Sequence, residues 1–365
     1  MDHPLLEVRD LRTYFKTDGG TVRAVDGVSF VVEPGEIFAV VGESGSGKSI
    51  TAMSILGLIP QPPGSIESGE ILWKGKDLLK ASEEELRKIR GREISMIFQD
   101  PMTSLNPVYT VGQQIAEIIR IHNKLSKAAA RSLALEMMAL VGIPRPEVRI
   151  DDYPHQFSGG MRQRVMIAMA ISCQPDLLIA DEPTTALDVT IQAQILEVLQ
   201  TAAAKTGSSI ILITHDLGVV AGLAERVAVM YGGQIVEQGS VDQVFYRPRM
   251  PYTWGLLESI ARLDQDRVGR LRPIIGSPPN MASPPHGCRF NPRCPYADKR
   301  CRAEMPDLTP VTFRQSARCL YATEAGWLSP VERLVEPPEK WDPRIQGFEE
   351  TQRLAAALPV DRPGR

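Results

Sequence analysis

Three short stretches of the chain carry the residue types that bind and cleave a chain of phosphates. The first, GESGSGKS at residues 42–49, has the spacing GxxxxGK(S/T). Glycines let backbone N–H groups turn inward around phosphates, a lysine adds a point charge at the β and γ phosphates, and a serine hydroxyl is a ligand for Mg²⁺. The residues predicted to hold a nucleotide here are Gly42, Ser44, Gly45, Gly47, Lys48 and Ser49.

An acidic pair, Asp181 and Glu182, follows the apolar run of residues 177–180. A continuous apolar run predicts a parallel strand buried on both faces, and ligands of open α/β sheets bind at the carboxyl ends of such strands. We therefore expect Asp181 to hold Mg²⁺, directly or through water, and Glu182 to act as the general base toward the attacking water. The alternative is a solvated acidic turn.

The third stretch is FSGGMRQR at residues 157–164, in which Ser158, Gly159 and Gly160 precede a predicted helix. This is a second helix N-terminus suited to an anion. One nucleotide does not need two such sites from one subunit. Two subunits packed head-to-tail could each provide this turn to the nucleotide of the other.

With this signature between its glycine loop and its acidic strand, the chain resembles the ATPase subunits of ABC transporters. The resemblance implies that Gln99 touches Mg²⁺ and the lytic water, and that His215 contacts the γ-phosphate. It also implies that Asp188 lies in the loop crossing the dimer interface and that Phe15 stacks on adenine. Taken alone, Gln99 and His215 would more often be ordinary loop residues, and Phe15 or its neighbour Tyr14 could equally belong to the core.

The same resemblance implies a magnesium site formed by Ser49, Gln99 and Asp181. One position departs from the family pattern, because Met161 stands where the signature usually has glutamine. The Ser158 hydroxyl and the glycine N–H groups remain as phosphate donors. We therefore expect ATP binding to persist and leave the rate of hydrolysis open.

Longer strings resemble one branch of the ABC family, the oligopeptide/dipeptide importers, which share them with importers of nickel and other small solutes. They are FQDPMTSLNP at residues 98–107, PHQFSGGMRQRVMIAMA at 154–170 and RPRMPYTWGLL at 247–257. The resemblance implies import of peptides across the bacterial inner membrane, with nickel or another small solute as the alternative. It further implies two transmembrane permease subunits, a second homologous ATPase that makes a heterodimer, and an extracytoplasmic solute-binding protein. The chain would then be peripheral, at the cytoplasmic face of the inner membrane.

The implied fold is α/β, a P-loop NTPase (RecA-like) core with an antiparallel β subdomain and a helical ABC subdomain. We expect a nucleotide-binding domain over residues 1–240, with the helical subdomain at about 100–165. A C-terminal extension with a cysteine module is expected over 241–322, and a flexible tail over 323–365. The apolar runs at 37–41, 177–180 and 209–215 predict core strands, and Ser126 and Gly142 are the predicted start and stop signals of one helix.

Four of the five cysteines, Cys288, Cys294, Cys301 and Cys319, lie close together, with gaps of five, six and seventeen residues. No export signal is seen, and clustered cysteines in a reducing compartment suggest a metal before disulfides. Zinc sites favour tight Cys-x₂₋₄-Cys pairs, which are absent here, whereas looser loops suit a [4Fe–4S] cluster. The family resemblance also favours the cluster; zinc and free thiols remain alternatives. Nearby arginines could offset the cluster's negative charge: Arg289, Arg293, Arg300, Arg302 and Arg318.

Composition narrows the remaining possibilities. The chain has 365 residues, 43% of them hydrophobic and 23% charged, which is typical of a globular protein. A net charge of −3 provides no global basic field for nucleic acid, and no apolar run predicts a membrane span. A soluble ABC ATPase acting on nucleic acid is therefore disfavoured, and so is a P-loop kinase or GTPase, which would not explain the SGG turn.

Overall fold

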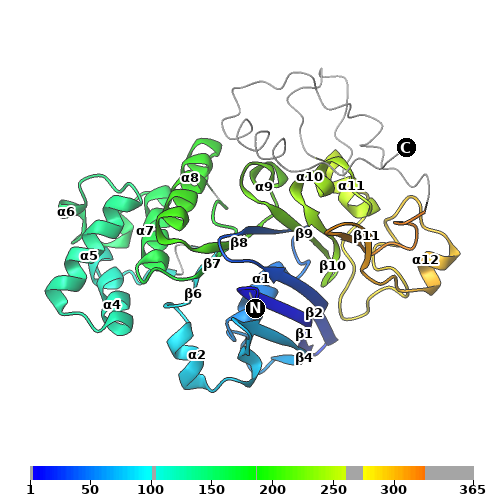
Figure 1. Ribbon diagram of the computed structural model, residues 1–365, viewed down its shortest axis with the longest axis horizontal. Helices are drawn as coiled ribbons and strands as arrows, with labels where there is room; N and C mark the ends of the chain where they lie inside the picture. The colour runs from blue at the N-terminus through cyan, green and yellow to red at the C-terminus, as the bar shows by residue number, and fades with distance from the viewer. Residues whose placement is uncertain (1–2, 101–103, 186, 260–273, 325–365) are drawn as a thin grey trace.

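The computed structural model describes residues 3–100, 104–185, 187–259 and 274–324. In these ranges a mixed central sheet, a separate antiparallel sheet and a lobe of helices form an α/β architecture (Figure 1). The three parts match the expected P-loop NTPase core, antiparallel subdomain and helical subdomain, so the predicted fold class is confirmed. The tail beyond residue 324 and Ala186 lie outside the described residues.

A mixed sheet of eight strands forms the centre of the molecule. Its strands are β3 (Ile37–Val41), β6 (Ile94–Ile97), β7 (Leu177–Asp181), β8 (Ser209–Thr214), β9 (Arg226–Tyr231), β10 (Gln234–Ser240), β11 (Thr309–Thr312) and β12 (Gln315–Ala317). The order is β11-β12-β10-β9-β3-β8-β7-β6. The pairs β6–β7, β7–β8, β8–β3 and β3–β9 are parallel. The pairs β9–β10, β10–β12 and β12–β11 are antiparallel. On β7, Leu178 and Ala180 enter one hydrophobic cluster while Leu177 and Ile179 enter another, so the strand is buried on both faces as predicted.

The second sheet is wholly antiparallel and has the strand order β2-β1-β4-β5. Its strands are β1 (Leu6–Thr17), β2 (Gly20–Val32), β4 (Gly64–Trp73) and β5 (Lys76–Asp77), followed by the 3₁₀ turn η1 (Leu78–Lys80) and α2 (Glu83–Ile89). Leu6 and Val28 of this sheet share one buried cluster with Val40 and Ile213 of the central sheet. The two sheets therefore form one packed unit.

The helical lobe occupies the left of Figure 1. It contains α4 (Val111–Asn123), α5 (Lys127–Leu140), α6 (Pro146–Arg149), η2 (Pro154–Gln156) and α7 (Gly159–Ile171). Ser126 caps α5 by accepting the backbone N–H of Ala129, which confirms the predicted helix start. Gly142 adopts a φ of 72° two residues beyond the end of α5, where the stop was predicted.

The remaining helices flank the central sheet or belong to the extension. They are α1 (Lys48–Ile55), α8 (Val189–Thr206), α9 (Leu217–Leu223), α10 (Val241–Tyr246), α11 (Pro251–Glu258) and α12 (Lys299–Ala303). Of the helices in the described ranges, none is both long enough and apolar enough to cross a membrane.

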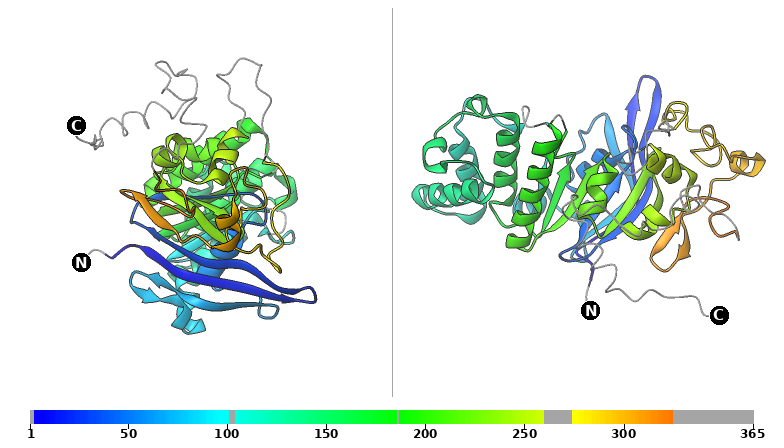
Figure 2. Two further views of the ribbon diagram at one scale, coloured as in Figure 1. Left: turned by 90° about the vertical axis from the view of Figure 1, so that its right-hand side faces the viewer. Right: turned by 90° about the horizontal axis from the view of Figure 1, so that it is seen from above.

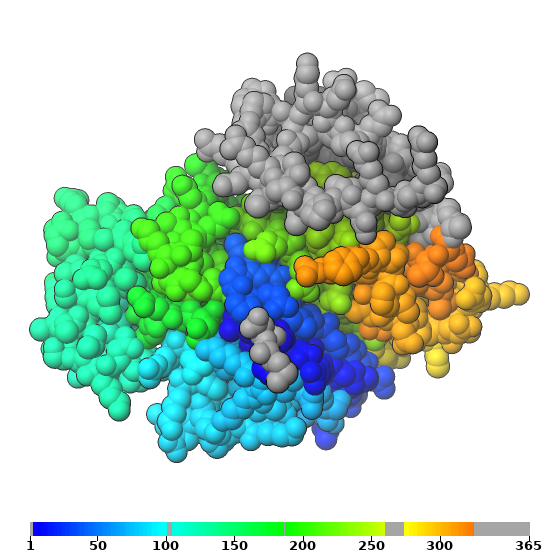
Figure 3. Space-filling model, viewed as in Figure 1, coloured from blue at the N-terminus to red at the C-terminus, as the bar shows by residue number. Residues whose placement is uncertain are grey.

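The later part of the C-terminal extension, residues 274–324, packs at the end of the molecule opposite the helical lobe (Figures 2 and 3). It also continues the central sheet, because β12 pairs with β10 through Glu237 opposite Ala317 and Gln238 opposite Ser316. The boundary expected near residue 240 therefore marks a change in sequence character, while hydrogen bonds of the central sheet run across it.

Glu237 is completely buried where the extension meets the central sheet. Its carboxyl group accepts hydrogen bonds from the backbone N–H groups of Arg249 and Met250, at 2.7 and 3.1 Å, and from Gln315 Nε2 at 3.0 Å. Burial raises the pKa of Glu237 to about 7, and these donors oppose the shift only in part. This junction therefore holds a carboxyl group that titrates near neutral pH.

The stability of the protein should depend on pH through Glu237. Between pH 4.5, its ordinary pKa, and about pH 7, the Glu237 carboxyl group is protonated in the folded chain and ionised in the unfolded chain. The contribution of this proton to the stability of the folded state is therefore complete below about pH 4.5 and is lost as pH rises toward about 7. Glu237→Gln loses an acceptor and should melt below the wild type at pH 5, and the gap in melting temperature should narrow by pH 8.

Glu84→Gln is the matched control, because Glu84 is exposed on α2 and Lys88 lowers its pKa, out of this pH range. Its melting temperature should follow that of the wild type from pH 5 to 8. A constant gap between Glu237→Gln and the wild type over this range would contradict the titration of Glu237.

Candidate functional site

The glycine loop joins β3 to α1, and two of its glycines lie where no side chain fits. Gly42 has a φ of 150° and Gly47 a φ of 105°. A Cβ atom on Gly42 would overlap the backbone oxygen of Met230, and one on Gly47 would overlap that of Ala24. Because Met230 is on the central sheet and Ala24 on the antiparallel sheet, both sheets press on the loop and fix its path.

Lys48 is the first residue of α1 and is buried beneath the loop. Its Nζ donates to the backbone oxygens of Gly42 at 2.8 Å and Glu43 at 3.1 Å. Burial lowers the pKa of Lys48, while Glu182, Asp181 and Glu43 act to raise it. The ammonium group thus lies inside the curve of the loop, among carboxylates.

Ser49 and Asp181 meet across the gap between α1 and β7. The Ser49 hydroxyl donates to Asp181 Oδ1 at 2.9 Å. Burial raises the pKa of Asp181, and Ser49 and Lys48 oppose that shift. A hydroxyl and a buried carboxylate side by side are hard oxygen donors of the kind that Mg²⁺ takes from a protein when phosphates complete its shell.

Glu182 brings together the other residues predicted to act in hydrolysis. Its Oε2 accepts hydrogen bonds from Gln99 Nε2 at 3.2 Å and from Thr185 Oγ1 at 2.8 Å, and His215 Nδ1 lies 3.5 Å away. The backbone of Glu182 has a φ of 46°, a left-handed conformation held by its N–H donating to Ile213. A non-glycine residue in this conformation at a strand end is typical of functional sites.

The SGG turn lies elsewhere on the chain's surface. Ser158 caps α7 by accepting the N–H of Met161 at 3.4 Å, and Asp188 caps α8 by accepting the N–H of Ile191 at 3.0 Å. Both caps are exposed. A Cβ on Gly160 would press on Ile191, so the turn packs directly against the start of α8.

Gly159 lies beside Leu187, so the turn and the Asp188 loop form one exposed surface. Within the part of the chain that the structure describes, none of the contacts of Ser158, Gly159 or Gly160 reaches the glycine loop. The structure therefore brings Lys48 and Ser49 together with the acidic pair, Gln99 and His215, and it keeps the SGG turn and Asp188 apart from them.

Phe15 and Tyr14 lie on β1 of the antiparallel sheet. The Phe15 ring is half-buried against Gly64, where a Cβ would be 2.9 Å from its Cε1. The Tyr14 hydroxyl donates to Asp26 at 2.6 Å, which gives this side chain a structural partner. Of the two side chains, only that of Tyr14 is held by a hydrogen bond.

The comparisons with known proteins agree with this geometry. The ABC transporter family model matches residues 25–185, and the model for the oligopeptide/dipeptide transporter C-terminal region matches residues 236–301. The oligopeptide transport ATP-binding protein OppD of Bacillus subtilis (strain 168) is 55% identical over 92% of each chain. The dipeptide transport ATP-binding protein DppD of the same organism is 56% identical over 86% of this chain and 94% of its own. The chain belongs to the ATP-binding subunits of the oligopeptide/dipeptide ABC transporter family.

Solved structures support the same assignment for the ATPase core. The dimeric ATP-binding cassette MJ0796, in a post-hydrolysis state bound to ADP and phosphate, matches with a TM-score of 0.58 and 26% identity. It covers 65% of this chain and 98% of that chain. CbiO1 from Clostridium perfringens, part of the CbiONQ complex, matches with a TM-score of 0.56 and 29% identity, covering 66% and 90%. This chain is thus an ATPase of the ABC type, extended at its C-terminus.

The four clustered cysteines of this ABC ATPase line one cavity, together with Met250 and Phe290. We call it the cysteine cavity. All four thiols are free of disulfides. Burial raises the pKa of Cys294 and of Cys319 to about 12, and the other clustered thiols add to both shifts. In the described residues, no three or more His, Cys, Asp or Glu side chains are placed to hold a metal ion.

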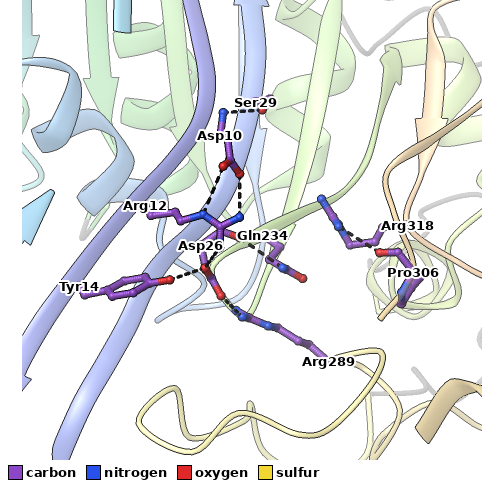
Figure 4. A network of polar contacts seen from close by, with 9 residues as sticks. All are labelled: Asp10, Arg12, Tyr14, Asp26, Ser29, Gln234, Arg289, Pro306 and Arg318. Carbon is purple, nitrogen blue, oxygen red and sulfur yellow. Dashed lines mark hydrogen bonds and ion pairs between the residues drawn. The ribbon is translucent and has the colours of Figure 1, made fainter. Parts of the chain in front are cut away.

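Two of the arginines beside these cysteines, Arg289 and Arg318, donate to partners outside the cavity. Arg289 pairs with Asp26 on β2, which also accepts from Arg12 at 2.9 Å and from Tyr14 (Figure 4). Arg318 Nη1 donates to the backbone oxygen of Pro306 at 3.0 Å. The expectation that these arginines offset the charge of a cluster stays a prediction, and Arg289 has Asp26 as its buried partner.

Two contacts of this site were missed from the sequence. Thr185, which donates to Glu182, stands three residues after it, and its position in the DEPTT string was the available signal. Glu43, inside the glycine loop, pairs with Arg293, which lies 250 residues further along the chain. No local sequence pattern predicts an ion pair between residues so far apart in the chain.

Replacing Gly45 or Gly47 by alanine should separate the effect of steric overlap from that of backbone strain. Gly47→Ala has both, because its Cβ would overlap Ala24, whereas Gly45→Ala meets nothing within 4 Å and carries only the strain of a φ of 77°. We expect Gly45→Ala to cost about 1–3 kcal/mol of stability. Gly47→Ala should lower the melting temperature further and abolish nucleotide binding. Equal melting temperatures for the two variants would contradict the close approach of Ala24.

Proposed function

We propose that this chain hydrolyses ATP to drive the import of peptides across the bacterial inner membrane. The observation that carries the proposal is the 55% identity, along 92% of both chains, to a protein named for oligopeptide transport. The match of residues 236–301 to the C-terminal region of peptide transporters supports it independently of the ATPase core. Import of nickel or another small solute is the second candidate, because that branch shares the same strings.

ATP would bind at the glycine loop. Lys48 already lies inside the loop and would transfer its hydrogen bonds from the carbonyls of Gly42 and Glu43 to the β and γ phosphates. The N–H groups of the loop, from Gly42 to Ser49, would surround the phosphates. Phe15, the free ring on β1, would stack on the adenine.

Ser49, Asp181 and Gln99 would hold Mg²⁺, which neutralises phosphate charge when it is bound. Glu182 would take the proton of the attacking water as general base, since its carboxylate is held by Gln99 and Thr185 at the end of β7. His215, 3.5 Å from that carboxylate, would contact the γ-phosphate.

A second ATPase subunit would complete each site. Ser158, Gly159 and Gly160 form an exposed helix N-terminus that does not reach its own glycine loop, so the phosphate it suits belongs to a facing chain. Asp188 lies on the same surface and would cross the dimer interface. We propose a heterodimer with a homologous ATPase.

Two permease subunits would receive the motion of this dimer. Val108, Tyr109 and Tyr153 are exposed at the start of α4 and before η2, and the backbone bond from Val111 to Asp152 holds these segments side by side. Phe98, next to Gln99, is also exposed. An apolar surface beside the site suits an integral partner. The chain would dock there at the cytoplasmic face of the inner membrane, and an extracytoplasmic binding protein would deliver the solute.

We propose that the cysteine cavity holds a [4Fe–4S] cluster. Four thiols on one cavity are the donor set that such a cluster takes from a protein, and Cys288, Cys294, Cys301 and Cys319 would hold it as an anionic centre. Their sequence spacing, which contains no tight Cys-x₂₋₄-Cys pair, favours the cluster over zinc.

Glu182→Gln tests the ATPase role. Because the amide cannot accept the proton of water, we expect hydrolysis to fall by at least about a hundredfold while Mg·ATP binding persists. In a strain lacking the native gene, the wild-type chain should restore uptake of a labelled dipeptide, and Glu182→Gln should not. Normal turnover by the variant would remove Glu182 from the base role, and restored uptake of nickel without peptide would favour the second candidate.

The cluster has its own test. Protein purified without oxygen should be brown and contain about four irons and four sulfides per chain. Cys294→Ser should lose most of that iron, whereas Cys173→Ser, a cysteine outside the cavity, should keep it. Colourless, iron-free wild-type protein would refute the cluster.

A further inference from the structure

The cysteine module, residues 288–319, touches the glycine loop directly. Arg293 Nη1 and Nη2 donate to the two carboxylate oxygens of Glu43 at 2.6 and 2.9 Å, a bidentate pair. The Arg293 side chain is 5% exposed and that of Glu43 is 27% exposed. This pair therefore links the nucleotide-binding loop to a segment 250 residues away in the sequence.

The position of the Arg293 guanidinium is fixed by two backbone oxygens of the extension and by Tyr231 of the central sheet. Nε donates to the backbone oxygen of Ile275 at 3.1 Å and Nη2 to that of Ile274 at 3.3 Å, while Nη1 donates to the Tyr231 hydroxyl at 3.3 Å. The next residue is Cys294, a wall of the cysteine cavity. The guanidinium and the thiol thus belong to one turn, and a shift of that turn moves both.

A second contact runs in parallel with the first. Tyr252 OH accepts the backbone N–H of Glu43 at 2.9 Å, and Met250, two residues earlier, lines the cysteine cavity. The Tyr252 ring packs on Phe290, another wall of the cavity, at a centroid distance of 5.4 Å. The loop and the cavity are therefore separated by close-packed side chains.

Glu43 presents an electrostatic difficulty that Arg293 resolves. A carboxylate within a phosphate-binding loop repels a triphosphate, and the repulsion is strong at short range in a poorly solvated site. Arg293 neutralises this carboxylate and holds it on the side of the extension. Without the arginine, the charge would remain in the loop and be free to turn toward the phosphates.

We propose that Arg293 is a positioning residue through which the cysteine module sets the nucleotide affinity of the glycine loop. The inference rests on the proposed function, in that ATP is taken to bind at this loop. Linkage between two sites is reciprocal, so a nucleotide on the loop must also steady the turn that carries Cys294. Nucleotide affinity then depends on the state of the four cysteines.

The first experiment measures binding of Mg·AMP-PNP to the full chain by calorimetry. Arg293→Met should raise the Kd by at least about tenfold, equivalent to about 1.4 kcal/mol. The double variant Glu43→Gln with Arg293→Met should return to within about threefold of the wild type, because the unpaired carboxylate is gone. A Kd for Arg293→Met within about twofold of the wild type, or a double variant as weak as the single one, would overturn the proposal.

Arg314→Met is the matched control, since Arg314 is an exposed arginine on the turn between β11 and β12, and its Kd should stay at the wild-type value. Far-ultraviolet circular dichroism verifies the fold of each variant. Lys48→Ala separates the inference from the function on which it rests. Loss of AMP-PNP binding in that variant supports the loop as the site, and unchanged binding would overturn both proposals.

The reciprocal experiment reads the turn that carries Cys294 without any activity. Hydrogen–deuterium exchange of backbone amides in residues 290–296, followed by mass spectrometry, should slow by about threefold or more when AMP-PNP is present, in the wild type and in the control variant. In Arg293→Met the nucleotide should make no difference. Exchange in the wild type at one rate with and without nucleotide would refute the linkage.

Discussion

The nucleotide site depends on the steric fit of the glycine loop between two sheets. Backbone oxygens of Met230 and Ala24 occupy the space that a side chain at Gly42 or Gly47 would need. The loop can therefore follow its path only where the antiparallel sheet is docked on the central sheet. The shared cluster of Leu6, Val28, Val40 and Ile213, which holds the sheets together, thereby also supports the loop at which we propose that ATP binds.

Charge is arranged around that loop so that its polar side chains have partners within the chain. Lys48 is buried, and the nearby carboxylates of Asp181 and Glu182 favour its charged form. Its hydrogen bonds to the loop carbonyls replace those that phosphates would accept. Ser49 donates to Asp181 in the same way. Lys48 and Ser49, which we propose to contact Mg·ATP, thus have hydrogen-bond partners within the chain. Nucleotide binding would exchange these hydrogen bonds for others.

The sequence was sufficient for features whose cause is local. The run at residues 37–41 ends in a glycine loop because apolar and glycine residues follow one another, and β3 has the predicted bounds. Ser126 and Gly142 mark the ends of α5 through their own hydrogen bonding and φ. The association of Gln99 and His215 with Glu182 was expected from the family resemblance, and the structure brings all three together. Arg293 and Glu43 could not be paired in advance, since only the packing of the extension decides which loop an arginine reaches.

The extension explains why this packing matters for the ATPase core, and the two solved structures compared above cover 65% and 66% of this chain. It adds β12 to the central sheet, buries Glu237 at that seam, joins Asp26 through Arg289, and joins Glu43 through Arg293. These contacts reach both sheets and the glycine loop between them. Because the sheets must stay docked for the loop to keep its shape, a change within the extension acts on the same fit that makes the loop competent. An added module with these contacts is therefore part of the structural support of the glycine loop, and its removal would take Arg289 from Asp26, Arg293 from Glu43, and Gln315 and the N–H groups of Arg249 and Met250 from Glu237.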